Sequence, residues 1–590
     1  MRMFATTIAA LATVTLGGCN VLPFGKKDVA TAATPPAQAS PSPSPLLSAP
    51  ATAAQTQKFV VSANPIASDA GMAVLRRGGS AVDAAIAMQA MLSLVEPQSS
   101  GLGGGAFLTY FNAKSGKVEI YDGREVAPAG ATPTMLLGSD GQPLPFGQAV
   151  LSGRATGVPG AVRMLGQAHA DHGTLAWDQL FDDAEAVARK GFVISPRLGR
   201  FLGGTSPQLQ AEDVRRYFKG KGGALATTGD RVRNGDYADF LRRLAKQGPD
   251  ALYTGKTAQR IVARTTGGDL PGTMTLADLS AYRAVKRAPL CGNWRAYIVC
   301  TPPPPSSGVG LLELLALLGR TDIDKRGPND PQSWYLFAEA SRLMYADRDL
   351  YVGDPKFVSV PVAGLLAPAY IAERAKLIGP FAAAAPAAGV PAGVVTAAAD
   401  TTREPAGTSH FIGGDAAGNV VSMTTTVESF FGTGRMVDGF FLNNQMTDFA
   451  FSPRDAQGRA AANAVAPGKR PRSSMTPLIM IDRQGKFAGA LGSAGGNAIL
   501  AYVGKSLIGA VEWKLPMQQA LALPNLVARG NSFQGEVTKF SPQILGALAA
   551  RGVRLQPGQG EDSGLHGVIV RDGKVDGGFD PRREGKVIVE

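Results

Sequence analysis

The sequence predicts a large layered protein that contains both α-helices and β-sheet. The chain has 590 residues, 45% of them hydrophobic and 18% charged, which is enough for two or more folding units or one large α/β body. Apolar residues recur with helical spacing at 67–77 and 81–94. Strand-turn-strand patterns follow later, at 409–427 and 478–491.

The N-terminal segment is expected to direct export rather than to fold. Arg2 supplies a positive charge, 4–16 is a short apolar stretch, and Leu16-Gly17-Gly18-Cys19 resembles the lipobox of bacterial lipoproteins. A transmembrane helix needs about 20 apolar residues, so this stretch is too short to span a bilayer. We expect a signal peptide at 1–18 and lipid on Cys19, which would anchor the protein in the bacterial cell envelope, facing the periplasm. The alternative is a plain secretory signal with an incidental cysteine.

Two further features belong to the same expectation. Residues 19–57 carry a tract rich in Ala, Pro and Ser that cannot bury enough apolar surface to fold, so it is interpreted as a tether. Asn20, where an inner-membrane retention signal has Asp, favours the outer membrane.

The first folded segments contain a glycine run that does not fit nucleotide binding. Gly78-Gly79 separates the two predicted helices, and Asp83 lies near the start of the second. Gly101-Leu102-Gly103-Gly104-Gly105 then stands between a helix and a strand, which is the reverse of the Rossmann order. A tight turn packed against the core is the better interpretation.

Two cysteines lie in a predicted hairpin at 290–300. Two short strands are expected around a Gly292-Asn293 turn, and the spacing of Cys291 and Cys300 allows a bridge across them. An oxidising compartment favours a disulfide over two free thiols. A proline run, Pro302 to Pro305, and Ser306-Ser307-Gly308 then predict a rigid turn before a helix at 311–318.

Composition and histidine placement exclude several functions. The net charge is +12, but the Lys and Arg residues are scattered, so we interpret them as a basic surface and expect no nucleic-acid partner. The four histidines have neither the company of a Ser hydrolase triad nor the pattern of metal ligands: His169, His172, His410 and His566. We expect no metal and no cofactor.

The most informative residues form a candidate self-cleavage point. Gly407 precedes Thr408 at the start of a predicted strand, after a second tract rich in Ala, Pro and Gly at 381–406. Cleavage between them would place a hydroxyl and a free α-amine on one residue, as an N-terminal nucleophile enzyme requires. An α-amine has a pKa of about 7.7 to 8.0, which suits a general base. The second hairpin leads into Gly492-Ser493-Ala494-Gly495-Gly496, whose backbone amides suit an oxyanion.

From about residue 62 onward the chain resembles the γ-glutamyltransferases, also called glutathione hydrolases. Seven motifs carry the resemblance in the family's order: 95–105, Asp122-Gly123-Arg124-Glu125, 303–308, Gly407-Thr408-Ser409-His410, 442–449, Lys469-Arg470-Pro471-Arg472-Ser473-Ser474-Met475, and 492–496. The resemblance implies a four-layer αββα sandwich of the N-terminal nucleophile hydrolases. It also implies a large subunit, 58–407, and a small catalytic subunit, 408–590, cut from one precursor.

The resemblance assigns roles position by position. Thr408 is the nucleophile, Thr426 hydrogen-bonds it, and Gly495 and Gly496 form the oxyanion hole. Three residues match those that hold the substrate α-carboxylate: Arg124, Ser473 and Ser474. Gln445 and Asp448 match those that hold its α-ammonium. The implied activity passes a γ-glutamyl group from glutathione or another amide to water, an amino acid or a peptide.

Two departures leave the acyl group open. Glu428 stands where transpeptidases of the family usually have Asn, so it either binds the ammonium more strongly or marks a different substrate. The loop between Phe449 and Lys469 is short and contains no Tyr. Both features also resemble acylases that cleave glutaryl-cephalosporin amides. A non-catalytic lipoprotein binding module is the remaining alternative, because fold does not fix function.

Overall fold

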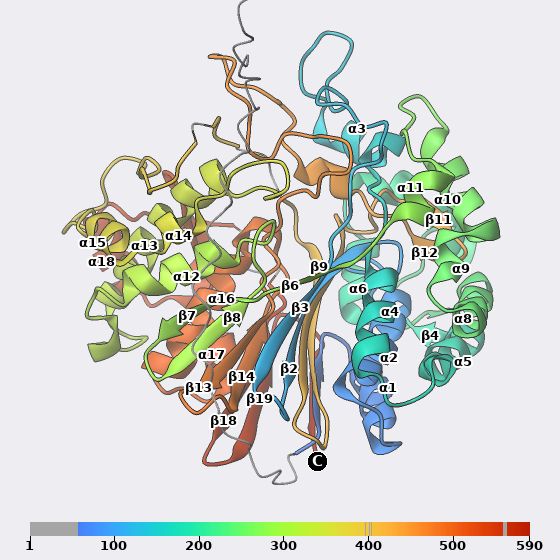
Figure 1. Cartoon of the computed structure of the whole chain (residues 1–590), viewed down its shortest axis with the longest axis horizontal. Coiled ribbons are helices and arrows are strands. Elements are labelled where there is room, and N and C mark those ends of the chain that lie inside the picture. The colour runs from blue at the N-terminus through green and yellow to red at the C-terminus, as the bar shows by residue number, and fades with distance from the viewer. Residues whose placement is uncertain (1–56, 396, 401, 403, 559–562) are drawn as a thin grey trace, which may run out of the picture. The chain divides into compact units, whose positions relative to one another are not determined.

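Two antiparallel β-sheets lie face to face in the computed structural model, and helices cover the outer side of each (Figure 1). The structure describes residues 57–395, 397–400, 402, 404–558 and 563–590, all of which fall within the compact unit Leu47–Glu590. The predicted signal peptide, Cys19 and nearly all of the tether lie outside the described residues. Within those residues, no helix is both long and apolar enough to cross a membrane.

The first sheet has seven strands in the order β20-β1-β9-β10-β2-β3-β6. Their bounds in that order are Lys586–Val589, Phe59–Ser62, Gly407–Gly414, Val420–Glu428, Gly105–Asn112, Lys117–Gly123 and Val285–Arg287. The second sheet has the order β19-β18-β14-β13-β8-β7. Its strands span Lys574–Phe579, His566–Arg571, Phe487–Gly492, Leu478–Asp482, Tyr297–Thr301 and Leu290–Trp294. Both predicted hairpins, β9–β10 and β13–β14, are therefore confirmed.

Helices from the N-terminal half cover the first sheet (Figure 1). They are α1 (Pro65–Arg76), α2 (Ala81–Val95), α4 (Ala161–His172), α5 (Asp182–Lys190), α8 (Gly235–Gln247), α9 (Asp250–Tyr253) and α10 (Gly255–Thr266). The two helices predicted at 67–77 and 81–94 are confirmed as α1 and α2. Ser80 and Asp83 form a reciprocal capping box that starts α2, as the position of Asp83 predicted.

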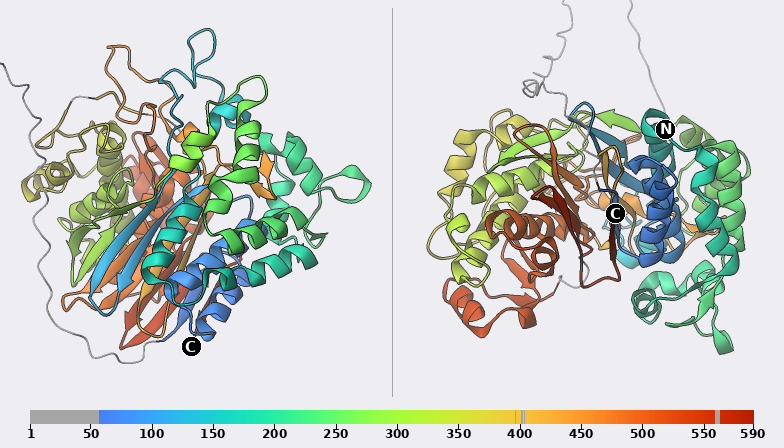
Figure 2. Two further views of the ribbon diagram at one scale, coloured as in Figure 1. Left: turned by 45° about the vertical axis from the view of Figure 1, so that its right-hand side comes forward. Right: turned by 90° about the horizontal axis from the view of Figure 1, so that it is seen from below.

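A different set of helices covers the second sheet (Figure 2). They are α12 (Gly308–Leu318), α13 (Pro331–Tyr351), α15 (Pro368–Ala375), α16 (Ile499–Leu507), α17 (Met517–Ala522) and α18 (Pro542–Ala550). Shorter helices are α3 (Phe146–Leu151), α6 (Pro196–Leu202), α7 (Glu212–Tyr217), α11 (Leu276–Ala281) and α14 (Val362–Leu365). Shorter strands are β4 (Phe192–Val193), β5 (Arg231–Val232), β11 (Met436–Val437), β12 (Phe440–Phe441), β15 (Leu526–Arg529), β16 (Ser532–Gly535) and β17 (Gln556–Pro557).

Three apolar cores hold these four layers together. The core between the sheets contains Val61, Ile412, Ile479 and Val568, and a larger core lies under the helices on each outer side. Because successive side chains of a strand point to opposite faces, Thr408 shares the inter-sheet face of β9 with Ile412. The predicted αββα sandwich is confirmed, and Thr408 stands at one end of its middle layer.

The predicted large and small subunits share both sheets. Strand β9 pairs with β1, β10 pairs with β2, and in the second sheet β13 pairs with β8. Each of these pairs joins a strand before residue 407 to one after it. A cut at Gly407 would therefore leave two pieces held by sheet hydrogen bonds and common cores, since neither piece has a complete sheet of its own.

The turn predicted at Gly292-Asn293 is wrong. Both residues lie inside β7, and the two-residue connection is Arg295-Ala296, with Arg295 at φ +54°. This register buries Trp294 and pairs Cys291 directly with Cys300. The two cysteines are joined by a disulfide, with their Cα atoms 4.1 Å apart.

Candidate active site

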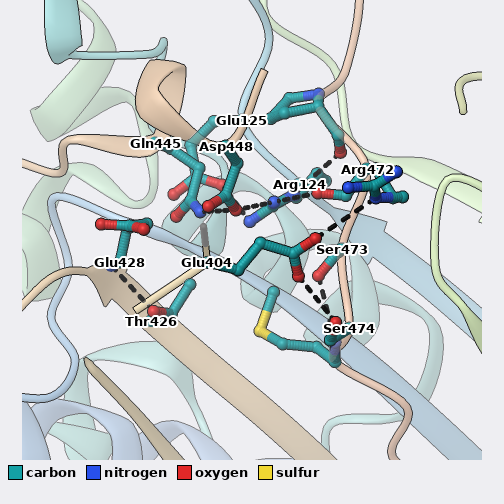
Figure 3. Close-up of polar contacts among 12 residues, drawn as sticks. Arg124, Glu125, Glu404, Thr426, Glu428, Gln445, Asp448, Arg472, Ser473 and Ser474 are labelled. Carbon is teal, nitrogen blue, oxygen red and sulfur yellow. Dashed lines mark hydrogen bonds and ion pairs between the residues drawn. The ribbon is translucent and has the colours of Figure 1, made fainter. Parts of the chain in front are cut away.

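A small cavity lies where the start of β9 and the end of β10 meet the segments that carry Arg124, Glu404, Gln445, Ser473 and Gly496. Figure 3 shows polar side chains that line this cavity. The volume of the cavity is about 20 Å³. The structure brings nearly all of the predicted site residues to its wall: Arg124, Thr408, Thr426, Glu428, Gln445, Asp448, Ser473, Ser474 and Gly496. It also places there four residues that have no role in the sequence analysis: Glu404, Pro405, Met475 and Ile499.

The Thr426 hydroxyl links the candidate nucleophile to the bond that would be cut. Thr408 Oγ1 donates to Thr426 Oγ1 at 3.2 Å, and Thr426 Oγ1 in turn donates to the carbonyl oxygen of Gly407. The Glu428 amide donates to the same Thr426 oxygen at 2.8 Å, which fixes its position. One hydroxyl therefore accepts from the attacking group and polarises the carbonyl that would be attacked.

Backbone crowding around Gly407 explains why glycine stands at the junction. A Cβ on Gly407 would lie 2.0 Å from the Glu428 carbonyl oxygen. The β9–β10 ladder is irregular between Thr426 and Glu428, and Glu428 has φ +81°, which is unusual for a residue with a side chain. Such backbone conformations are costly and concentrate at functional sites.

The glycine run at 101–105 forms the close packing that the sequence predicted. A Cβ on Gly104 would lie 1.9 Å from the carbonyl oxygen of Thr426, and one on Gly103 would lie 2.2 Å from that of Phe441. The run therefore packs against the end of β10 near the candidate threonine pair, Thr408 and Thr426.

The predicted oxyanion glycines form the turn between β14 and a 3₁₀ turn at Gly496–Ala498. Gly495 has φ +133° and Gly496 has φ +55°, so both positions favour glycine. A Cβ on Gly496 would lie 2.2 Å from the carbonyl oxygen of Glu404. In the uncut chain this turn is thus in direct contact with the segment that precedes Thr408.

Arg124 joins the two predicted halves of the substrate site. Its Nη2 donates to Asp448 Oδ2 at 2.5 Å and to the Arg472 carbonyl oxygen at 2.7 Å. Gln445 Nε2 donates to the same Asp448 oxygen at 2.5 Å. The resemblance assigns Arg124 to the α-carboxylate of the substrate and Asp448 to its α-ammonium group. In this structure the two side chains are bound to each other.

Carboxyl groups are concentrated on the side of the cavity that is predicted to bind the substrate α-ammonium. Ser429 Oγ and Asn444 Nδ2 both donate to Glu428 Oε2. Burial, and then the neighbouring Asp448, raise the pKa of Glu428 well above its ordinary value. Burial also raises the pKa of Asp448, despite the charge of Arg124.

Three buried oxygen atoms on this side accept no hydrogen bond from a nitrogen or hydroxyl group of the described residues: Glu428 Oε1, Gln445 Oε1 and Asp448 Oδ1. The Glu428 and Asp448 side chains are hydrogen-bonded to each other, which requires a proton on one of the two carboxyl groups. A cationic donor that replaces this proton would satisfy these oxygens.

The proline and serine motif at 302–308 holds the loop segment that carries Ser473 and Ser474. Ser307 donates to the Ser473 carbonyl oxygen through both its amide and its hydroxyl, each at 2.8 Å. Ser306 Oγ donates to the Met475 carbonyl oxygen at 2.8 Å. The motif forms the predicted turn before α12 and, through these hydrogen bonds, also positions the serine pair.

Sequence reasoning missed the ion pairs behind that serine pair. Arg348, on α13, binds Glu404 through Nη2 at 2.6 and 2.9 Å and also reaches Ser474 Oγ at 2.6 Å. Arg472 Nε lies 3.2 Å from Glu404 Oε1. Burial opposes ionisation of Glu404, but the two arginine charges outweigh it and lower its pKa to about 2. Arg472 stands within a recognised motif, whereas nothing in the sequence around Arg348 indicated a site.

Glu119 and Asp171, the acidic residues beside His172, already form ion pairs with a lysine. His172 Nε2 lies 2.9 Å from Glu119 Oε2, and these two residues form a possible ligand group with Asp171. Lys286 Nζ lies 2.8 Å from Glu119 and 3.1 Å from Asp171. These residues do not line the cavity at Thr408.

Comparisons with known proteins identify the family of this chain. The family model for gamma-glutamyltranspeptidase matches residues 67–590. The chain belongs to this family. It is 35% identical to a glutathione hydrolase proenzyme of Bacillus subtilis (strain 168), over 90% of this chain and 91% of the relative. The resemblance drawn from the seven motifs is thereby confirmed, and the family is one of enzymes.

Two other relatives carry acylase names. The chain is 32% identical to the Acylase ACY 1 proenzyme of Pseudomonas sp. (strain SE83), over 90% of this chain and 93% of the relative. The crystal structure of cephalosporin acylase from Bacillus halodurans superposes with a TM-score of 0.80 at 26% identity, covering 93% of this chain and 98% of that one. This member of the gamma-glutamyltranspeptidase family is therefore similar to hydrolases of both kinds.

Proposed function

We propose that the protein is a self-processing γ-glutamyl hydrolase and transferase whose nucleophile is Thr408. The hydroxyl chain from Thr408 through Thr426 to the Gly407 carbonyl oxygen is the observation that carries the self-processing half. The unsatisfied acceptors of Glu428, Gln445 and Asp448 support a substrate with an α-ammonium group. The names of the glutathione hydrolase relatives support the same reaction.

Processing begins with the Thr408 hydroxyl. Its oxygen attacks the Gly407 carbonyl carbon, and its proton passes to the departing Thr408 nitrogen. The C–N bond breaks, so the acyl group is then held on the threonine oxygen as an ester. Thr426 stabilises the developing oxyanion because it already donates to that carbonyl oxygen. Water hydrolyses the ester, which leaves a carboxylate on Gly407 and a free amine on Thr408.

Turnover uses the same oxygen a second time. The free α-amine of Thr408 takes the hydroxyl proton, and the oxygen attacks the γ-carbonyl of the donor. The amides of Gly495 and Gly496 are assigned to donate to the resulting oxyanion, and the donor's amine leaves with a proton. Water or an amine acceptor then releases the γ-glutamyl group from the Thr408 ester, so ping-pong kinetics are expected.

Two measurements test this proposal. Wild type should run as two fragments, 58–407 with its N-terminal extension and 408–590, while Thr408→Ala should run as one band. A γ-glutamyl anilide should react faster than the glutaryl anilide, which lacks the ammonium group. A single uncut band for the wild type, or a preference for the glutaryl compound, contradicts the corresponding half of the proposal.

A glutaryl-type acylase is the second candidate, and it rests on the two relatives with acylase names. A glutaryl group has no ammonium group to satisfy Glu428 and Asp448, whose carboxyl groups would then face an apolar methylene. Burying unpaired polar groups against an apolar group is costly, so the cavity favours the γ-glutamyl donor.

We also propose export and lipid attachment at Cys19, on the sequence pattern of the first nineteen residues alone. Labelled palmitate should enter the wild-type protein and should not enter Cys19→Ser. Equal labelling of the two proteins contradicts attachment at this cysteine.

A further inference from the structure

The side chain of Glu404 fills the carboxylate-binding side of the cavity in the uncut chain. Glu404 lies four residues before Thr408, and only 3% of its surface is exposed. Its carboxylate accepts from Arg348 Nη2 at 2.6 and 2.9 Å and from Ser474 Oγ at 2.6 Å. Figure 3 shows it pointing toward Ser473 and Ser474, the pair that the family resemblance assigns to the substrate α-carboxylate.

The backbone of the same residue occupies the glycine turn. The Glu404 carbonyl oxygen accepts from the Asn497 amide at 3.3 Å. A Cβ on Gly496 would lie 2.2 Å from that oxygen and 2.4 Å from the Pro405 carbonyl oxygen. Glu404 thus places its carboxylate beside Ser474 and Arg348 and its carbonyl oxygen beside Gly496. An acyl donor also presents a carboxylate and a carbonyl oxygen.

Among the described residues, the ion-pair charges around Glu404 balance only while it is present. Three arginines and three carboxylates of this part of the chain form one connected network of ion pairs: Arg348, Arg472, Arg529, Asp349, Asp400 and Glu404. Removal of Glu404 alone would leave one excess positive charge beside Ser474. An uncompensated buried charge is strongly unfavourable, so the vacated position would select an anion.

We propose that Glu404 is a temporary internal ligand of this enzyme. In the uncut chain its carboxylate occupies the position that later takes the α-carboxylate of the acyl donor. Cleavage after Gly407 releases the segment 404–407 and exposes that position. Arg348, together with Arg472, is then a specificity-determining residue for donors that carry a carboxylate. This inference rests on the proposed function and adds two residues to it.

The first test measures ligand binding to the uncut chain by calorimetry, with L-glutamate as the probe. Thr408→Ala should bind no L-glutamate, whereas Thr408→Ala with Glu404→Ala should bind it. Thr408→Ala with Glu373→Ala is the matched control, because Glu373 is an exposed acid paired with Lys376 on the surface. It should behave as Thr408→Ala alone.

Either of two results overturns the internal-ligand role. One is equal binding by Thr408→Ala with and without Glu404, and the other is no binding by the Glu404→Ala double variant. Glu404→Gln in the same background keeps the side-chain shape and leaves the position filled, so it should bind L-glutamate less well than the Glu404→Ala double variant. Thermal unfolding should show that both double variants are folded.

The second test uses the cut enzyme and two donors. One is a γ-glutamyl anilide, and the other is its analogue with a carboxamide in place of the α-carboxylate. Arg348→Gln should reduce the preference for the carboxylate donor by about tenfold to a hundredfold, the range for a hydrogen bond to a charged group. A purely structural arginine would lower kcat/KM for both donors alike.

These outcomes separate this inference from the function on which it rests. If wild type turns over the γ-glutamyl anilide but Arg348→Gln keeps the full preference, the role of Arg348 is wrong and the proposed function stands. If wild type does not turn over the anilide, the proposed function itself fails.

Discussion

Replacement of Thr426 by valine should slow self-cleavage by about two to three orders of magnitude. Valine keeps the shape of the side chain and removes only the hydroxyl, which accepts from Thr408 Oγ1 and donates to the Gly407 carbonyl oxygen. Loss of one oxyanion donor typically costs about 2.7 to 4 kcal/mol of transition-state stabilisation, or about 10² to 10³ in rate.

The same substitution should also lower stability, and the two effects can be separated. The Glu428 amide loses its hydrogen bond to Thr426 Oγ1 in the precursor ground state as well as in the transition state. An unsatisfied buried donor costs about 1 to 3 kcal/mol, which should appear in the free energy of unfolding rather than in the cleavage rate. Thr426→Ser restores the hydroxyl and should recover most of the rate.

Thr425 provides a matched control on the same strand. Its hydroxyl is buried and has no hydrogen-bond partner among the described residues, so Thr425→Val removes the same atoms without removing a bond. The assay is a chase of cell-free translated, labelled precursor, with the uncut and cut bands measured on a denaturing gel. Cleavage of Thr426→Val at the wild-type rate, or equal slowing of cleavage in Thr425→Val, would refute the role of the Thr426 hydroxyl.

Three further changes probe the charges and the disulfide. Burial and Asp448 raise the pKa of Glu428, so kcat/KM for a γ-glutamyl anilide should rise with pH as the Glu428 carboxyl group ionises and binds the substrate ammonium. The pH profile of Glu428→Gln should lack this rise. A rise retained in Glu428→Gln would exclude Glu428 as its source. Burial raises the pKa of Glu125 from 4.5 to about 8, so the folded state binds this proton more tightly than the unfolded state and loses stability as pH rises across that interval. Glu125→Gln should therefore raise the thermal midpoint relative to wild type more above this interval than below it, and a constant difference would contradict the shift. Joint replacement of Cys291 and Cys300 by serine should lower the free energy of unfolding by about 2 to 3 kcal/mol, as expected for a loop of about ten residues. Urea unfolding measures this loss, and no change would show that the bond does not stabilise the fold.

The sequence predicted the hairpins where residue chemistry and strand period agree. The β9–β10 hairpin has polar turn residues between two strands, and the structure has the same turn. The hairpin at 290–301 misled because Gly292-Asn293 has the composition of a turn while Arg295, at φ +54°, does not. Burial of Trp294 and the pairing of Cys291 with Cys300 set that register, and both are tertiary effects that local propensity does not contain.

The candidate site also contains residues that the sequence predicts and residues that it does not. Residues inside the seven motifs could be named in advance because the motif itself carries the chemistry. Arg348 and Glu404 could not, since they are 56 residues apart and gain their roles only when α13 and the segment before Thr408 meet. Both are charged residues in unremarkable surroundings, for which a surface ion pair is the ordinary expectation.

The bulge at the end of β10 would couple the proposed nucleophile to the proposed selection of the acyl group. Its irregular register lets the Thr426 hydroxyl reach Gly407 and Thr408, while the positive φ of Glu428 two residues later accompanies a carboxyl group turned toward Asp448. The Glu428 amide is hydrogen-bonded to the Thr426 oxygen, so the two functions share one short piece of backbone. A substitution that relaxes this bulge should therefore change cleavage and substrate preference together. A substitution at Ser473 or Arg348, which belong to other segments, should change substrate preference with less effect on cleavage.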